Sequence, residues 1–104
     1  MAYGRLDTKV WNAAVVGAGG KSLDHYTSDN PFITAYGNAS AATTITIEVS
    51  NDKITWFVTQ VTQVLAGAGD FVINATIATP YVRLSSSGAA TITGWISAKG
   101  VGAA

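Results

Sequence analysis

The chain has 104 residues, of which 48% are hydrophobic and 12% are charged, and its six basic and six acidic side chains cancel to zero formal charge. This length fits a single domain. The Lys and Arg residues are scattered and form no basic cluster of the kind that binds a phosphate backbone, so we expect no nucleic-acid partner. The lack of cysteine excludes disulfides, thiolate catalysis and zinc–thiolate sites.

The chain begins with a short polar arm, residues 1–7, and a first strand is expected over 8–16. The arm contains no long apolar run, so we expect neither a signal peptide nor a membrane-spanning segment. The following GAGGKS, residues 17–22, ends in Gly-Lys-Ser as a phosphate-binding loop does. However, Val15 stands where that loop needs glycine, and turn formers follow where its helix should begin. We interpret GAGG as a turn and predict no nucleotide site.

The only histidine, His25, lies between Asp24 and Tyr26. Adjacent residues in a strand point to opposite faces, so Asp24 and His25 cannot pair as a catalytic dyad, and we interpret His25 as a partly exposed loop residue. A two-histidine metal site is impossible, and the acidic residues are too dispersed for a calcium site. We expect no metal, no cofactor and no enzymatic activity.

The rest of the chain alternates apolar and polar residues with period two. In TITIEVS, residues 44–50, Ile45, Ile47 and Val49 share one face, and TITGWIS at 91–97 repeats the pattern. β-Branched residues fit half-buried strands, and Gly, Asn and Asp mark the turns between them. Short strands with regular turns predict an all-β fold, an antiparallel two-sheet β-sandwich of jelly-roll type over residues 8–99. After 8–16, its strands are expected near 31–37, 43–50, 54–60, 71–77, 80–86 and 90–98.

The segment FVTQVTQVL, residues 57–65, allows two interpretations. Its apolar residues have helical spacing, but five of its nine residues are β-branched. A strand with a bend or bulge near Thr59–Gln60 explains the same phase shift. We favour the bent strand, and a short helix is the alternative.

The alternation assigns faces to the large side chains. Trp56 shares a face with Ile54 and Val58, so it is expected in the core, whereas Tyr81 and Trp95 lie opposite their apolar neighbours. Exposed aromatic rings of this kind stack on sugars or fill subunit interfaces. The polar face of TITIEVS should include Glu48 and Ser50. The residues expected to point inward are Ile45, Ile47, Val49, Trp56, Val58, Val82, Leu84, Ile92 and Ile96.

Two runs resemble small β-sandwich structural proteins of tailed phages: AYGNASAATTITIEVSNDKITWF at 35–57 and PYVRLSSSGAATITGWISAK at 80–99. The resemblance covers about the last two-thirds of the chain and implies a virion component without enzymatic activity, either a capsid decoration (cement) protein or part of a tail or fibre. The residues that carry it are Gly37, Asn38, Ser50, Asp52, Trp56, Tyr81, Val82, Arg83 and Leu84.

The resemblance implies a location on the capsid surface and the major capsid protein or other virion subunits as partners. It also implies a homo-oligomer, with a trimer favoured at three-fold capsid positions. The low charge supports association, because little electrostatic repulsion keeps copies apart. We expect the contacts to use Tyr3 and Arg5 of the arm together with Tyr81, Arg83 and Trp95. The small-residue tail, 100–104, lies outside the sandwich.

SND-x-x-TW at 50–56 and YVRL at 81–84 also resemble discoidin-type galactose-binding sandwiches. Those domains are usually longer, with loop spikes that form the binding pocket, and this chain lacks the length for such loops. A carbohydrate-binding module of a phage tail or surface protein is therefore the alternative function.

Overall fold

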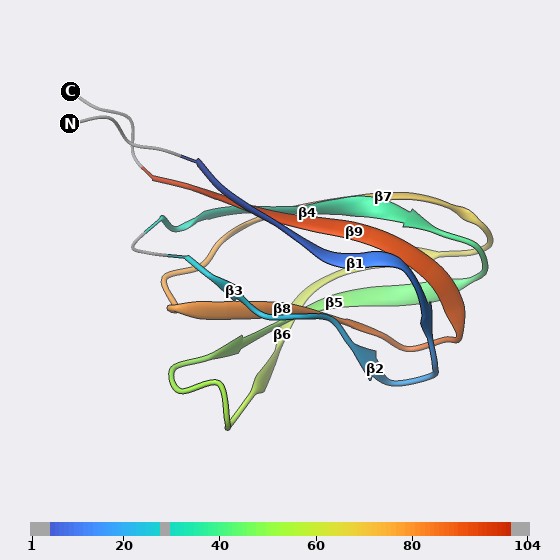
Figure 1. Cartoon of the computed structure of the whole chain (residues 1–104), viewed down its shortest axis with the longest axis horizontal. Coiled ribbons are helices and arrows are strands. Elements are labelled where there is room, and N and C mark those ends of the chain that lie inside the picture. Colours follow the sequence, from blue (N-terminus) through green and yellow to red (C-terminus); the bar gives the residue numbers. More distant parts are fainter. Residues whose placement is uncertain (1–4, 28–29, 101–104) are drawn as a thin grey trace.

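Figure 1 presents the computed structural model of the chain, which describes residues 5–27 and 30–100. Within these residues every regular element is a β-strand, as the period-two pattern predicted. The strands are β1 (Arg5–Val16), β2 (Gly20–Lys21), β3 (His25–Tyr26), β4 (Phe32–Ala39), β5 (Thr43–Ser50), β6 (Phe57–Leu65), β7 (Gly69–Thr76), β8 (Tyr81–Ser86) and β9 (Ala90–Lys99).

The strands form two antiparallel sheets that lie over one another as layers (Figure 1). The first sheet has the order β1-β9-β4-β7 and the second the order β2-β8-β5-β6, with β3 also pairing with β8. This alternation of strands between two sheets is that of a jelly roll. The predicted fold class is confirmed. The two-residue strands β2 and β3, which the sequence pattern did not predict, lie along the same edge of β8.

The core consists of apolar side chains from the inner faces of both sheets. Six of the nine residues predicted to point inward are fully buried, and Val49 packs at the margin of the core. The largest fully buried apolar side chains are Phe71, Ile33, Ile45, Ile47, Leu84, Ile92, Ile96 and Val82.

The prediction was wrong for Trp56 and Val58. Val58 is 70% exposed because it pairs with Glu48 on the outer face of the second sheet, and Trp56 lies before β6, half-buried. The residues before β6 form a loop instead of a strand, in which Asp52 Oδ1 accepts the N–H groups of Ile54 and Thr55, both at 2.9 Å. The tryptophan in the core is Trp11 of β1.

The segment 57–65 is a strand with a bulge, as the favoured interpretation predicted. The pairing of β5 with β6 shifts register between Thr46 and Glu48, opposite the stretch around Thr59. There the Thr59 hydroxyl donates to the carbonyl of Ile47 (2.7 Å) and accepts the N–H of Val61 (3.1 Å). The side chain thus satisfies backbone groups that the bulge leaves unpaired.

GAGG forms the predicted turn. The N–H of Gly20 donates to the carbonyl of Gly17 at 2.9 Å, and the chain continues into strand β2 without a helix. At the chain ends, Arg5–Asp7 of the expected arm belong to β1, while residues 1–4 and 101–104 lie outside the described residues.

Candidate functional site

The outer face of the second sheet carries a buried carboxylate between two cations. Glu48, in the middle of β5, is only 2% exposed, although the sequence pattern placed it on the wet face. Lys21 Nζ donates to Glu48 Oε2 at 2.6 Å, and Arg83 Nε donates to Glu48 Oε1 at 2.8 Å. A carboxylate removed from water is tolerated when charged donors replace its hydration in this way.

These two partners control the ionisation of Glu48. Burial alone would raise the pKa of Glu48, but the hydrogen bonds and positive charges of Lys21 and Arg83 outweigh it and hold that pKa below its usual range. Lys21 therefore belongs to the cluster that holds β2, β5 and β8 together, and substituting it should not be neutral. The turn alone gave no reason to assign Lys21 this structural role.

An aromatic ring covers the guanidinium of Arg83. The Arg83 guanidinium carbon lies 4.2 Å from the ring centroid of Trp56, within the range of a cation–π contact. The indole N–H of Trp56 donates to the carbonyl of Lys53 at 3.2 Å, which fixes the ring over Arg83. The SND-x-x-TW motif thus forms a closed loop that places its tryptophan on the sheet surface.

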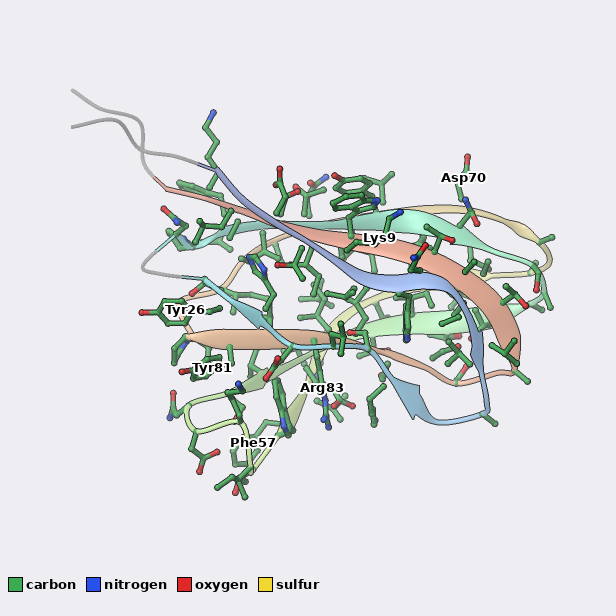
Figure 2. All side chains as sticks on the ribbon, viewed as in Figure 1. Lys9, Tyr26, Phe57, Asp70, Tyr81 and Arg83 are labelled. Carbon is green, nitrogen blue, oxygen red and sulfur yellow. The ribbon has the colours of Figure 1, made fainter. Side chains whose placement is uncertain are left out.

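A second aromatic pair continues this surface toward β3. The rings of Tyr26 and Tyr81 have centroids 5.5 Å apart, and Lys53 Nζ lies 5.5 Å from the Tyr81 ring. Lys53 also pairs with Asp24 at 3.4 Å. Figure 2 shows Tyr26, Tyr81, Arg83 and Phe57 on the same side of the molecule. We call the set Tyr26, Trp56, Tyr81 and Arg83 the aromatic–arginine face.

The opposite side of the sandwich presents two further aromatic side chains, Tyr36 and Trp95, which we call the aromatic band. Trp95 of β9 pairs across the first sheet with Lys9 of β1 and Tyr36 of β4, and the Lys9 ammonium lies 5.2 Å from the Trp95 ring. A shallow hollow of about 350 Å³ beside this band is lined by Phe32, Thr34, Tyr36, Ser97 and Lys99. Lys9 marks this side in Figure 2.

The predicted interface residues therefore do not form one surface. Tyr81 and Arg83 lie together on the aromatic–arginine face, whereas Trp95 lies on the other sheet, on the opposite side of the sandwich. Tyr3 lies outside the described residues, and Arg5 is placed only as the first residue of β1. Sequence reasoning missed the positions of Glu48 and Trp56, because cross-strand partners depend on register, which no local pattern supplies.

His25 is buried, so the prediction of a partly exposed loop residue was wrong. It belongs to β3 and is 4% exposed, with its Nδ1 lying 2.6 Å from the Thr8 hydroxyl oxygen. Its Nε2 is buried without a hydrogen-bond partner among the described residues. Burial lowers the pKa of His25, and the nearby charge of Asp7 partly opposes this effect.

We expect the free energy of unfolding to fall in two steps on acidification. Below about pH 6.5 the unfolded chain protonates His25 before the folded protein does, which favours unfolding until the folded pKa is passed. Below about pH 4.3 the same argument applies to Glu48, whose folded pKa is also lowered. Urea denaturation between pH 8 and pH 3 measures both steps.

His25→Gln provides the control for this prediction. Because His25 is the only histidine, the variant should lose the upper step and keep the lower one. Equal stability of the parent protein at pH 7.5 and pH 5 would contradict the assignment of the upper step to His25.

Among the described residues, the structure contains no group of three or more His, Cys, Asp or Glu side chains that could hold a metal ion. The same residues contain no helix long and apolar enough to cross a membrane.

Comparison with known proteins identifies the fold. No family model and no curated protein matches the sequence. The solved structure of the PBSX exported protein XepA is similar over 95% of this chain, with a TM-score of 0.65 and 13% sequence identity. This chain spans only 38% of XepA.

Two further structures cover the chain with lower similarity. PirA matches 91% of it at a TM-score of 0.46 and 13% identity, with 92% of PirA covered. The disulfide-linked pili of Bacillus endospore appendages match 97% of it at a TM-score of 0.48 and 15% identity, with 93% of that chain covered. Similarity at this level supports no argument about function.

Proposed function

We propose that the chain is a non-enzymatic structural subunit of a phage particle, and specifically that it decorates the capsid surface and stabilises the head through subunit contacts. The observation that carries this proposal is the aromatic–arginine face, where aromatic rings gather around Arg83 on a sandwich with few charges. Aromatic and arginine side chains are enriched in protein interfaces. Tyr26 of this face is 56% exposed, and Phe57, on the same side of the molecule (Figure 2), is 66% exposed.

The phage assignment has two independent supports. The sequence resembles small sandwich proteins of tailed phages over the runs 35–57 and 80–99, and the fold resembles an exported protein of the phage PBSX over most of the chain. The proposed partners are the major capsid protein or other virion subunits, and further copies of the chain itself. We propose neither a nucleic acid nor a membrane as a partner.

We assign the capsid contact to the aromatic–arginine face. Tyr81 and Arg83 are held there by Lys53, Glu48 and Trp56, so they meet a partner without losing further side-chain freedom. Aromatic and arginine side chains that are already ordered carry much of the binding energy of protein interfaces. The arm, which contains Tyr3, is proposed to extend this contact along the capsid.

The experiment uses purified particles and undecorated heads. Mass spectrometry of separated heads and tails should find the chain in the heads, and the purified protein should co-sediment with undecorated heads. Deletion of residues 1–4, which leaves β1 intact, should weaken binding by about tenfold or more, or about 1.4 kcal/mol. Deletion of residues 101–104 is the matched control and should leave binding unchanged.

Tyr81→Ala should weaken head binding as well, whereas Trp95→Ala, on the opposite side, should not. Absence of the chain from purified particles would overturn the proposal of a virion subunit. Its presence in tails but not in heads would overturn decoration of the capsid and leave the broader structural role.

Carbohydrate binding is the second candidate function, and the aromatic band favours it. Trp95 and Tyr36 are directly opposite each other on adjacent strands, beside the hollow that Phe32 and Lys99 help to line. Flat aromatic surface next to polar groups suits stacking against a sugar ring. A glycan array tests this function: binding that is lost in Trp95→Ala and kept in Trp56→Ala would favour it over decoration.

A further inference from the structure

The sheet edges in the described residues differ in how they are protected against pairing with another chain. Edge strands are kept from pairing by charges, irregularities or very short length. At one edge, β1 carries Asp7 and Lys9 and has two register shifts against β9. At another, β8 is covered by the two-residue strands β2 and β3.

The edges formed by β7 and β6 differ in the same respect. β7 carries Asp70, and the N–H of Val72 already donates to the side-chain oxygen of Gln63 at 3.0 Å. β6 is nine residues long and contains neither a charged residue nor a proline. Its protective features are the bulge at Thr59, whose polar groups are bonded within the chain, and the contact of the Gln63 side chain with Val72 of β7. The free edge of β6 is therefore the one best suited to accept another strand.

β6 also exposes apolar side chains where a pairing strand would lie. Val58 and Val64 are 70% and 71% exposed on the outer face, and Phe57 is 66% exposed. Alternation continues through the bulge, so that residues 58, 60, 62 and 64 are exposed and residues 59, 61, 63 and 65 are partly buried. Both ends of the strand thus keep the same inward and outward faces.

The sequence of β6 is complementary to itself in the antiparallel direction. FVTQVTQVL has the same order of apolar and polar residues when it is read backwards, with Val61 at its centre. About a two-fold axis at Val61, Phe57 would face Leu65 of a second copy, Val58 would face Val64, and Thr59 and Gln60 would face Gln63 and Thr62. Directly opposite residues in an antiparallel pair share a face, so exposed valine meets exposed valine.

We propose that β6 pairs antiparallel with β6 of a second copy of this chain, which joins the two second sheets into one continuous sheet. A two-fold interface requires each contact to occur twice with the partners exchanged, and the symmetric pattern of β6 meets this requirement. The contact zones are Phe57–Val58 of one copy against Val64–Leu65 of the other, on both sides of the central bulge. Pairing supplies partners for free backbone groups and covers both valines.

This inference goes beyond the proposed function and does not rest on it. A two-fold contact closes as a dimer, whereas the resemblance to phage proteins implied a trimer at three-fold capsid positions. The two arrangements predict different masses in solution, so failure of one proposal can be distinguished from failure of the other.

Sedimentation equilibrium of the full chain should give twice the mass of one chain. Val58→Lys combined with Val64→Lys places lysine opposite lysine, and this variant should sediment as a monomer where the parent protein is a dimer. Val58→Glu combined with Val64→Glu should also be monomeric. An equimolar mixture of the two double variants should restore the dimer, because each lysine then faces a glutamate.

Val15→Lys is the matched control, because Val15 is 90% exposed but lies on β1, and this variant should remain dimeric. Circular dichroism should give the same spectrum for all variants, since the substituted side chains are exposed. A parent protein that is monomeric up to about 1 mM, a trimer, or an oligomer unaffected by the double lysine substitution would overturn the proposal.

The register of the proposed pairing between two β6 strands can be tested separately by cysteine cross-linking, because the chain contains no cysteine of its own. When Val58→Cys and Val64→Cys proteins are mixed and oxidised, disulfides should join one variant to the other, since opposite residues in an antiparallel pair are close enough to be bridged. Each variant alone should give little cross-linking. Equal cross-linking of the single variants would overturn the register centred on Val61.

Discussion

Replacing Trp11 with alanine should lower the free energy of unfolding by about 3–5 kcal/mol, whereas Trp56→Ala should cost only about 1 kcal/mol. Trp11 is buried between the two sheets and its ring lies 3.6 Å from the position that a Cβ on Gly94 would occupy, so truncation leaves a cavity that the core cannot fill. Trp56 is half-buried on the outer face, where its loss removes a contact with Arg83 and exposes the guanidinium to water.

Urea denaturation of the two variants measures this difference, and the fold of each is checked by circular dichroism. The comparison tests the structure against the sequence pattern, since the pattern alone placed Trp56 in the core. A Trp56→Ala protein that is destabilised as much as Trp11→Ala would contradict the placement of Trp56 outside the core.

Replacing Gly37 with alanine should cost about 3 kcal/mol or more, because the added methyl group would overlap the backbone of the neighbouring strand. A Cβ at Gly37 would lie 2.0 Å from the carbonyl oxygen of Thr93 and 2.7 Å from Cα of Gly94. Gly37 pairs with Gly94 in the centre of the first sheet, where β4 and β9 each have a neighbour on their other side. Neither strand can move away without disturbing a second pairing.

Gly67→Ala is the control for this prediction, because a Cβ at Gly67 would meet no atom within 4 Å. Its stability should change by no more than about 0.5 kcal/mol. Thermal and urea denaturation of both variants would decide the matter, and a Gly37→Ala protein as stable as Gly67→Ala would contradict the close approach of β4 and β9.

Much of the fold follows from local pattern. The stretch 43–50 is a strand with the predicted boundaries, and the β-branched residues of 57–65 correctly favoured a bulged strand over a helix. GAGG was correctly predicted to form a turn. These predictions succeed because alternation and turn residues act over a few neighbouring positions, which the sequence displays directly.

The candidate site was less predictable, because it depends on which strands are neighbours. Tyr81 and Arg83 were selected as surface residues, but only the pairing of β5 with β8 places Arg83 beside Glu48. The burial of Glu48 and His25 has no local signal, since Glu48 occupies a polar-face position of the alternating strand and His25 lies between Asp24 and Tyr26 in a segment of turn formers. Trp95, another of the selected surface residues, lies on the first sheet, and only the tertiary structure shows that it is on the opposite side of the sandwich from Tyr81 and Arg83.

The sequence by itself therefore determined the class of fold, the positions of most strands and the inward set of isoleucines, since these depend on side-chain periodicity. Only the tertiary structure decided which polar side chains are buried, which tryptophan fills the core and which edge strand is open. Those properties depend on register and on the order of strands in each sheet, and a jelly roll sets both by contacts between residues far apart in the chain. Glu48 illustrates this: its partners are Lys21 and Arg83, each contributed by a different strand.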